Sequence, residues 1–236
     1  MQTPRNGSKA AAFSAETGTD RLPAATDVLQ AHGLALQFDG EPGPLFAGLC
    51  FALATGTHAL DGDSGSGKTS LLHGLAGARP LQGQLWLRGQ PMPDGPVARQ
   101  PLVWWADAQV PGFDALTPEA LMQVLQQRHG PVDAAAWQRH VDGFGLAPHA
   151  FKTLHMLSTG MRRKAVLAAG LASACPLLLL DEPCGGLDAP AIAWLVQALN
   201  ERAAQAGCAT LMVSGRWPDG LARAGQVVLP PAEAGL

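Results

Sequence analysis

The sequence lacks a strong excess of either charge, a close pair of cysteines, and an apolar run long enough to cross a membrane. It has 16 lysine and arginine residues against 19 aspartate and glutamate residues, a formal net charge of −3 over 236 residues. Nucleic acids and anionic membranes attract clustered positive charge, which this balance does not supply. We therefore expect no nucleic-acid partner.

Few residues of the chain could form a metal site, a disulfide framework or a membrane anchor. Four widely spaced cysteines form no CxxC motif, which favours small buried thiols over zinc or disulfides: Cys50, Cys175, Cys184 and Cys208. The apolar stretch 165–180 is shorter than the roughly 20 residues that span a bilayer. Residues 1–27 lack the apolar core of a secretory signal and predict a disordered tail. We expect a soluble chain.

Strand-like and helix-like patterns alternate after this tail. Runs bounded by glycine and proline predict strands at 33–38, 57–62, 83–89, 101–105, 176–181 and 209–214. Polar capping residues predict helices that start after Thr117, Asp133, Ser158 and Asp188. The later strands are apolar without alternation, which predicts a parallel sheet covered by helices on both faces. Residues of about 110–157 are predicted to be a helical insertion.

The stretch GDSGSGKTS matches the phosphate-binding pattern GxxxxGK[ST], between a strand-like run and a helix. Its residues are Gly62, Asp63, Ser64, Gly65, Ser66, Gly67, Lys68, Thr69 and Ser70. Glycine lets the backbone approach phosphate oxygens, and successive N–H groups at a helix N-terminus supply positive potential. Lys68 adds a charge toward the β- and γ-phosphates, and Thr69 offers a hydroxyl to Mg²⁺.

Two carboxylates follow the buried strand run in LLLLDEP, residues 177–183. Ligands of open α/β sheets bind at the carboxyl ends of the strands, where Asp181 and Glu182 stand. Asp181 is a candidate Mg²⁺ partner, and Glu182 is a candidate to orient or deprotonate a water that attacks the γ-phosphate.

The stretch LSTGM at 157–161 resembles the signature segment of ABC-type ATPases, whose usual form is LSGGQ. Thr159 and Met161 depart from that form. The following DEPCGGLD is similar to the family's Walker B segment and D-loop, with Asp188 in the D-loop position. The resemblance covers about residues 28–230. It implies an α/β fold, a P-loop NTPase with a RecA-like core, an N-terminal antiparallel β portion and a helical insertion, within an ATP-binding domain at 28–236.

The resemblance also implies ligands, further site residues and partners. Phe38 would stack on adenine, and Gln109 would contact Mg²⁺ and the attacking water. Ser158 and Gly160 would close over ATP held by a second cassette, in a homo- or heterodimer. A separately encoded transmembrane permease would be the partner, which places the chain at the cytoplasmic face of the cell membrane.

Gly215 stands where the family has a switch histidine that donates a hydrogen bond to the γ-phosphate. Loss of one such donor typically costs about 10²–10³ in rate. Either Arg216 or a water offsets the loss and hydrolysis is weak, or the chain is a degenerate regulatory cassette. A soluble ABC-type protein without a transport role is a further alternative.

Histidines and tryptophans outside these motifs suggest no additional site. The histidines share no metal-ligand spacing and are predicted to lie at the surface or on helix faces: His58, His73, His129, His140, His149 and His155. Trp104 and Trp105 are expected to pack internally; the alternative is an exposed contact with a partner's helix.

Overall fold

The computed structural model describes residues 27–38, 40–41, 43–106 and 113–231. Most of the predicted tail 1–27 and the predicted site residue Gln109 lie outside the described residues. The division of the chain at residue 28 therefore stays a prediction.

A four-stranded antiparallel sheet forms the N-terminal part. Its strand order is β2-β1-β4-β5, with β1 (Leu29–Leu36), β2 (Phe46–Leu53), β4 (Gln82–Leu87) and β5 (Gln90–Pro91). The prediction of a strand at 33–38 started four residues late, because buried and partly exposed positions already alternate from Leu29. Strand β2 was not predicted at all: its sequence FAGLCFAL shows no clear alternation, yet it pairs along β1. The antiparallel β portion is confirmed.

A five-stranded sheet with only parallel pairs forms the centre of the molecule. The order across it is β6 (Val103–Ala106), β7 (Leu177–Asp181), β8 (Ala209–Val213), β3 (Gly56–Asp61) and β9 (Gly225–Val228). The central strands β7 and β8 are almost wholly buried, as their uninterrupted apolar sequences predicted. The edge strand β9 was missed, because only one of its residues is buried. Since all five strands run parallel, the residues that follow β3, β7 and β8 lie together at the carboxyl ends of the strands.

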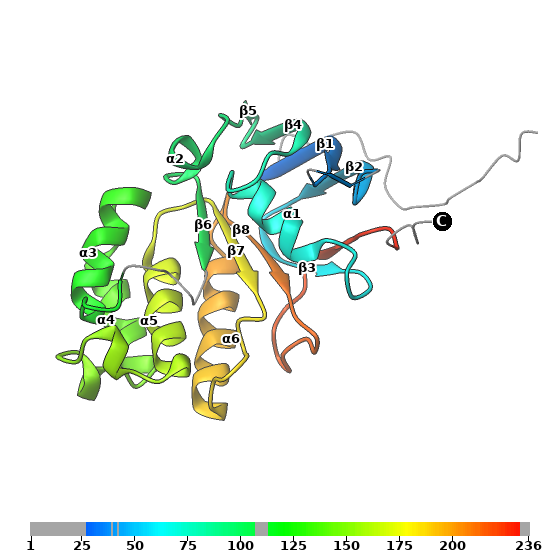
Figure 1. Cartoon of the computed structure of the whole chain (residues 1–236). Helices are drawn as coiled ribbons and strands as arrows, with labels where there is room; N and C mark the ends of the chain where they lie inside the picture. The colour runs from blue at the N-terminus through cyan, green and yellow to red at the C-terminus, as the bar shows by residue number, and fades with distance from the viewer. Residues whose placement is uncertain (1–26, 39, 42, 107–112, 232–236) are drawn as a thin grey trace, which may run out of the picture.

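Helices surround this sheet, and predicted capping residues start four of them. The helices are α1 (Lys68–Leu75), α2 (Pro96–Arg99), α3 (Pro118–His129), α4 (Ala134–Gly143), α5 (Thr159–Ala172) and α6 (Ala189–Ala203). The side chains of Thr117, Asp133, Ser158 and Asp188 each accept an N–H bond from the first turn of the next helix. Helices α3 and α4 lie beside α5, at the opposite end of the molecule from β1 and β2 (Figure 1).

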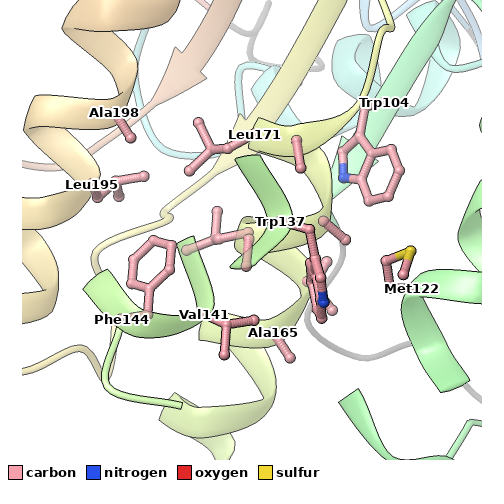
Figure 2. Close-up of a cluster of buried hydrophobic side chains, with 14 of the residues drawn as sticks. Trp104, Met122, Trp137, Val141, Phe144, Ala165, Leu171, Leu195 and Ala198 are labelled. Carbon is pink, nitrogen blue, oxygen red and sulfur yellow. The ribbon is translucent and has the colours of Figure 1, made fainter. Parts of the chain in front are cut away.

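Two buried clusters hold these layers together. One lies on the side of the antiparallel sheet and α1. The other joins α3, α4, α5 and α6 to the parallel sheet and includes Trp104, Trp137, Phe144 and Leu195 (Figure 2). Trp104 is only 1% exposed, which confirms internal packing and excludes it as a surface contact; Trp105 is partly buried.

The prediction of a surface or helix-face position was wrong for His58, which lies in a strand, whereas His140 does lie on a helix but is buried. His58 is buried in β3, where its Nε2 lies 2.9 Å from the carbonyl oxygen of Ala54. His140 is buried where α4 packs against Trp194 of α6. Both have helix or strand neighbours that come from distant parts of the chain, so local spacing did not reveal their burial.

Candidate nucleotide-binding site

The phosphate loop joins the end of β3 to the start of α1. Gly67 is the N-cap of α1 with φ +96°, and a Cβ atom there would lie 2.6 Å from Leu45 Cδ2. Glycine is thus required both by the left-handed backbone and by the close approach of Leu45. The Nζ of Lys68 donates to the carbonyl oxygens of Gly62 and Asp63, each at 2.7 Å. These bonds fold the loop around the lysine ammonium.

Donors remain at the N-terminal end of α1. No side chain among the described residues caps this helix, and the first N–H groups of a helix have no intrahelical partner, so they suit an anion. The Oγ of Ser66 is fully buried and finds no hydrogen-bond partner among the described residues. The loop therefore combines a cation, free backbone donors and a helix terminus, the set that binds polyphosphate.

Thr69 and Asp181 meet although 112 residues separate them in sequence. The Oγ1 of Thr69 donates to Oδ2 of Asp181 at 2.6 Å. Asp181 is the last residue of β7, partly buried, and pairs with Val213 of β8. Hydroxyl and carboxylate oxygens are ligands that Mg²⁺ accepts next to phosphates, so this pair fits a magnesium ion.

Glu182, which follows Asp181, is more exposed and has an unusual backbone conformation. Its backbone has φ +44°, a left-handed conformation that costs a residue with a side chain about 1–2 kcal/mol. Its N–H donates to the carbonyl oxygen of Val213 at 3.0 Å, and its side chain is exposed. A Cβ atom at Gly215 would lie 3.6 Å from Glu182 Oε1. The structure thus brings residue 215 beside this carboxylate.

The signature-like segment packs against the residues that follow Glu182. Ser158 caps α5, its Oγ accepting the N–H of Met161 at 3.3 Å. A Cβ atom at Gly160 would lie 2.4 Å from the carbonyl oxygen of Gly186, so a side chain there is excluded. Asp188 accepts 2.8 Å and 2.9 Å bonds from Lys164 Nζ and the N–H of Ala191, which lower the pKa of its carboxyl. Nucleotide contacts of Ser158, Gly160 and Asp188 stay a prediction.

Two contacts near the site were not predicted from the sequence. Phe38 is partly buried after β1, and the Arg79 guanidinium lies 5.1 Å from its ring centroid. Arg223 forms an ion pair with Asp61, the residue before the phosphate loop, and lies over the ring of Trp217. No local pattern links these residues, because each contact joins separate elements. The adenine-stacking role of Phe38 stays a prediction.

Comparison with known proteins decides the family. A family model described as "ABC transporter" matches residues 49–185, more than half of the chain. The chain belongs to the ABC transporter family. Its relatives include the cytochrome c biogenesis ATP-binding export protein CcmA of Pseudomonas syringae pv. syringae, 38% identical over 189 residues (78% of this chain and 86% of the relative). The taurine import ATP-binding protein TauB of Pseudomonas aeruginosa is 35% identical over 166 residues (68% and 62%).

Solved structures agree with the fold of an ABC cassette. One described as the ATP-binding subunit of an ABC transporter has a TM-score of 0.70 at 22% identity and covers 80% of each chain. A putative ABC transporter ATP-binding protein from Pyrococcus furiosus has a TM-score of 0.68 at 17% identity and covers 85% of this chain and 96% of that one. The predicted P-loop NTPase fold is therefore confirmed.

Family membership sets the general activity of this ABC cassette. It is an ATP-binding subunit of the transporter type, and the family implies ATPase activity, usually with Mg²⁺. Among the described residues, no helix is both long and apolar enough to span a bilayer. The family match ends at residue 185, so the segment around Gly215 lies beyond it.

Proposed function

We propose that this ABC cassette binds ATP on residues 62–70, pairs with a second cassette, and hydrolyses ATP slowly to drive a separate membrane subunit. The observation that carries the proposal is the contact of Thr69 with Asp181, 2.6 Å between oxygens. It joins the phosphate loop to the strand end that bears both carboxylates. A Gly/Ser loop without a role in phosphate binding would not be expected to contact this strand.

Each residue of the site has a distinct part in binding. The Lys68 ammonium neutralises phosphate charge, and the backbone N–H groups of the loop fix the phosphate oxygens. Thr69 and Asp181 would hold Mg²⁺, which, when bound, neutralises charge on the β- and γ-phosphates. Phe38 is proposed to stack on the base. None of these groups involves residue 215. We therefore expect an ATP affinity similar to that of a cassette that has the switch histidine.

Glu182 is proposed to orient and accept a proton from the attacking water. Its side chain is exposed at the same sheet edge as Asp181. Gln109 is proposed as a second contact to that water. Gly215 offers no donor to the γ-phosphate, and one missing donor corresponds to about 10²–10³ in rate. We therefore expect ATP hydrolysis to be slow but measurable.

A regulatory cassette is the second candidate. It is favoured by one observation: residue 215 lies beside Glu182 and has no side chain. Such a subunit would bind ATP, complete the site of a competent partner cassette, and leave hydrolysis to that partner. It would co-purify with a cassette different from itself.

The membrane partner is tested by co-purification. The tagged chain is recovered from its native membranes in mild detergent, and the stoichiometric components are identified. A multi-span membrane protein supports the proposal, and its identity chooses between export and import, both of which occur among the relatives. Recovery alone, or with soluble proteins or nucleic acid only, contradicts the transport role.

The ATP site is tested by substitution. Lys68→Ala is expected to weaken ATP binding roughly 10- to 100-fold, because a hydrogen bond to a charged group is worth about 1.5–3 kcal/mol. Lys152→Ala is the matched control, since Lys152 lies in the surface turn next to the exposed ring of Phe151. Fluorescent ATP titrations compare the two variants. Equal affinities would contradict binding at residues 62–70.

A further inference from the structure

The backbone of Glu182 is held on both sides of its Cα atom. Its N–H is bound by β8 through Val213, as described above. Its carbonyl oxygen accepts two bonds, from the N–H of Gly185 at 3.1 Å and from Nη1 of Arg163 at 3.1 Å. The left-handed conformation of residue 182 is therefore maintained by partners on either side, one of which is a distant side chain.

Arg163 reaches this backbone from helix α5. Its Nη1 also donates to the carbonyl oxygen of Gly185, so one guanidinium bridges both ends of the turn 182–185. A Cβ atom at Gly185 would lie 2.5 Å from Nη1, so a side chain there would displace the guanidinium. The side chain is partly buried and makes no ion pair among the described residues; carbonyl oxygens are its partners. The Arg163 guanidinium therefore interacts with the backbone of this turn rather than with a carboxylate.

Further contacts tie the same helix to the same segment. Gly160 lies against the carbonyl of Gly186, and Lys164 pairs with Asp188 at 2.8 Å. Three positions in the first two turns of α5 therefore contact the segment 182–188. Because Ser158 begins this helix, a shift of the helix start displaces the turn 182–188 with it.

We infer that Arg163 is a positioning residue for hydrolysis: it holds the backbone of Glu182 so that the carboxylate faces the attacking water. This inference rests on the proposed function of Glu182. The same brace links the signature-like segment to the catalytic carboxylate of its own chain. Contacts made at Ser158 and Gly160 would therefore alter the position of Glu182 through Arg163 rather than through the sheet.

A measurement without turnover tests the brace itself. Amide hydrogen exchange of the full chain, with the wild type, Arg163→Gln and Arg162→Gln compared, reports the turn through the N–H groups of Gly185 and Leu187. Arg163→Gln is expected to speed exchange there about tenfold, since a charge-assisted bond is lost. Arg162→Gln is the control: its guanidinium pairs with Asp114 at 3.0 Å, away from the turn. Equal exchange in both variants overturns the brace.

Turnover tests whether the brace acts through Glu182. Arg163→Gln is expected to lower kcat about 10- to 100-fold, as misplacement of a catalytic group does, with KM for ATP nearly unchanged. Arg163→Lys should restore part of kcat, because an ammonium can still donate to the carbonyls. In a Glu182→Gln background, Arg163→Gln should cost nothing more. Additive losses, or a change in KM alone, contradict the positioning role.

Failure of the proposed function would look different from failure of this inference. If the wild-type complex binds ATP but releases no phosphate, the proposed hydrolysis fails, whereas the exchange measurement still decides whether Arg163 holds the turn. If the wild type hydrolyses ATP and Arg163→Gln equals Arg162→Gln in kcat, the inference fails alone. Thermal melts identify any variant that does not fold, and Arg163→Lys then replaces Arg163→Gln in the comparison.

Discussion

Gly215→His should raise ATP hydrolysis by this cassette. A Cβ atom at residue 215 would have one described neighbour within 4 Å, Glu182 Oε1 at 3.6 Å, which is an ordinary contact distance. Gly215 is not among the glycines with positive φ, so a side chain brings no backbone strain. The Cβ atom of a histidine can therefore be accommodated at this position. Arg216 does not fill this place, because its side chain is 85% exposed and pairs with Asp219.

The size of the gain follows from the donor that is restored. One preorganised donor to developing charge is worth about 2.7–4 kcal/mol, or roughly 10²–10³ in kcat. ATP affinity should change little, because Lys68, the loop amides and the proposed Mg²⁺ ligands are untouched. The measurement is phosphate release at saturating Mg-ATP from the complex recovered with its membrane subunit.

Gly215→Ala is the matched control, since it occupies the same Cβ position and adds no donor. It should leave kcat unchanged. In a Glu182→Gln background, Gly215→His should also bring no gain, because the water then lacks its proposed base. The reasoning is refuted if Gly215→His binds ATP as the wild type does yet releases phosphate no faster than Gly215→Ala.

Three further predictions concern stability and reactivity. Gly143→Ala should destabilise the fold by about 1–3 kcal/mol in urea titrations, because its Cβ would lie 2.0–2.5 Å from ring atoms of Trp194. Burial lowers the pKa of His140 from 6.5 to about 4, so protonation favours unfolding. The free energy of unfolding should therefore decrease by up to about 1.4 kcal/mol per pH unit as the pH falls from 6.5 toward 4. His140→Gln should make this decrease smaller. Burial raises the pKa of the Cys175 thiol to about 11, so maleimide should label exposed Cys50 in the folded chain and Cys175 only after unfolding.

Sequence reasoning was accurate where a local interaction decides the structure. The cap residues Thr117 and Asp133 started their helices as predicted, because a cap bonds to an N–H two or three residues away. Reasoning failed for β2 and β9, in which few residues are buried and whose formation depends on a neighbouring strand. The burial of His140 was not predicted for the same reason: it involves Trp194 of another helix.

The sequence by itself determined the phosphate loop, the two carboxylates after an apolar strand and the glycine at position 215, because each is a short pattern read along the chain. Only the tertiary structure decided which of these groups meet. Thr69 contacts Asp181, and residue 215 lies beside Glu182, because β3, β7 and β8 end at one edge of a parallel sheet. Arg163 reaches Glu182 because α5 packs over that edge. Strand order and helix packing join residues far apart in sequence, and they arise from burial of the whole core rather than from any local pattern.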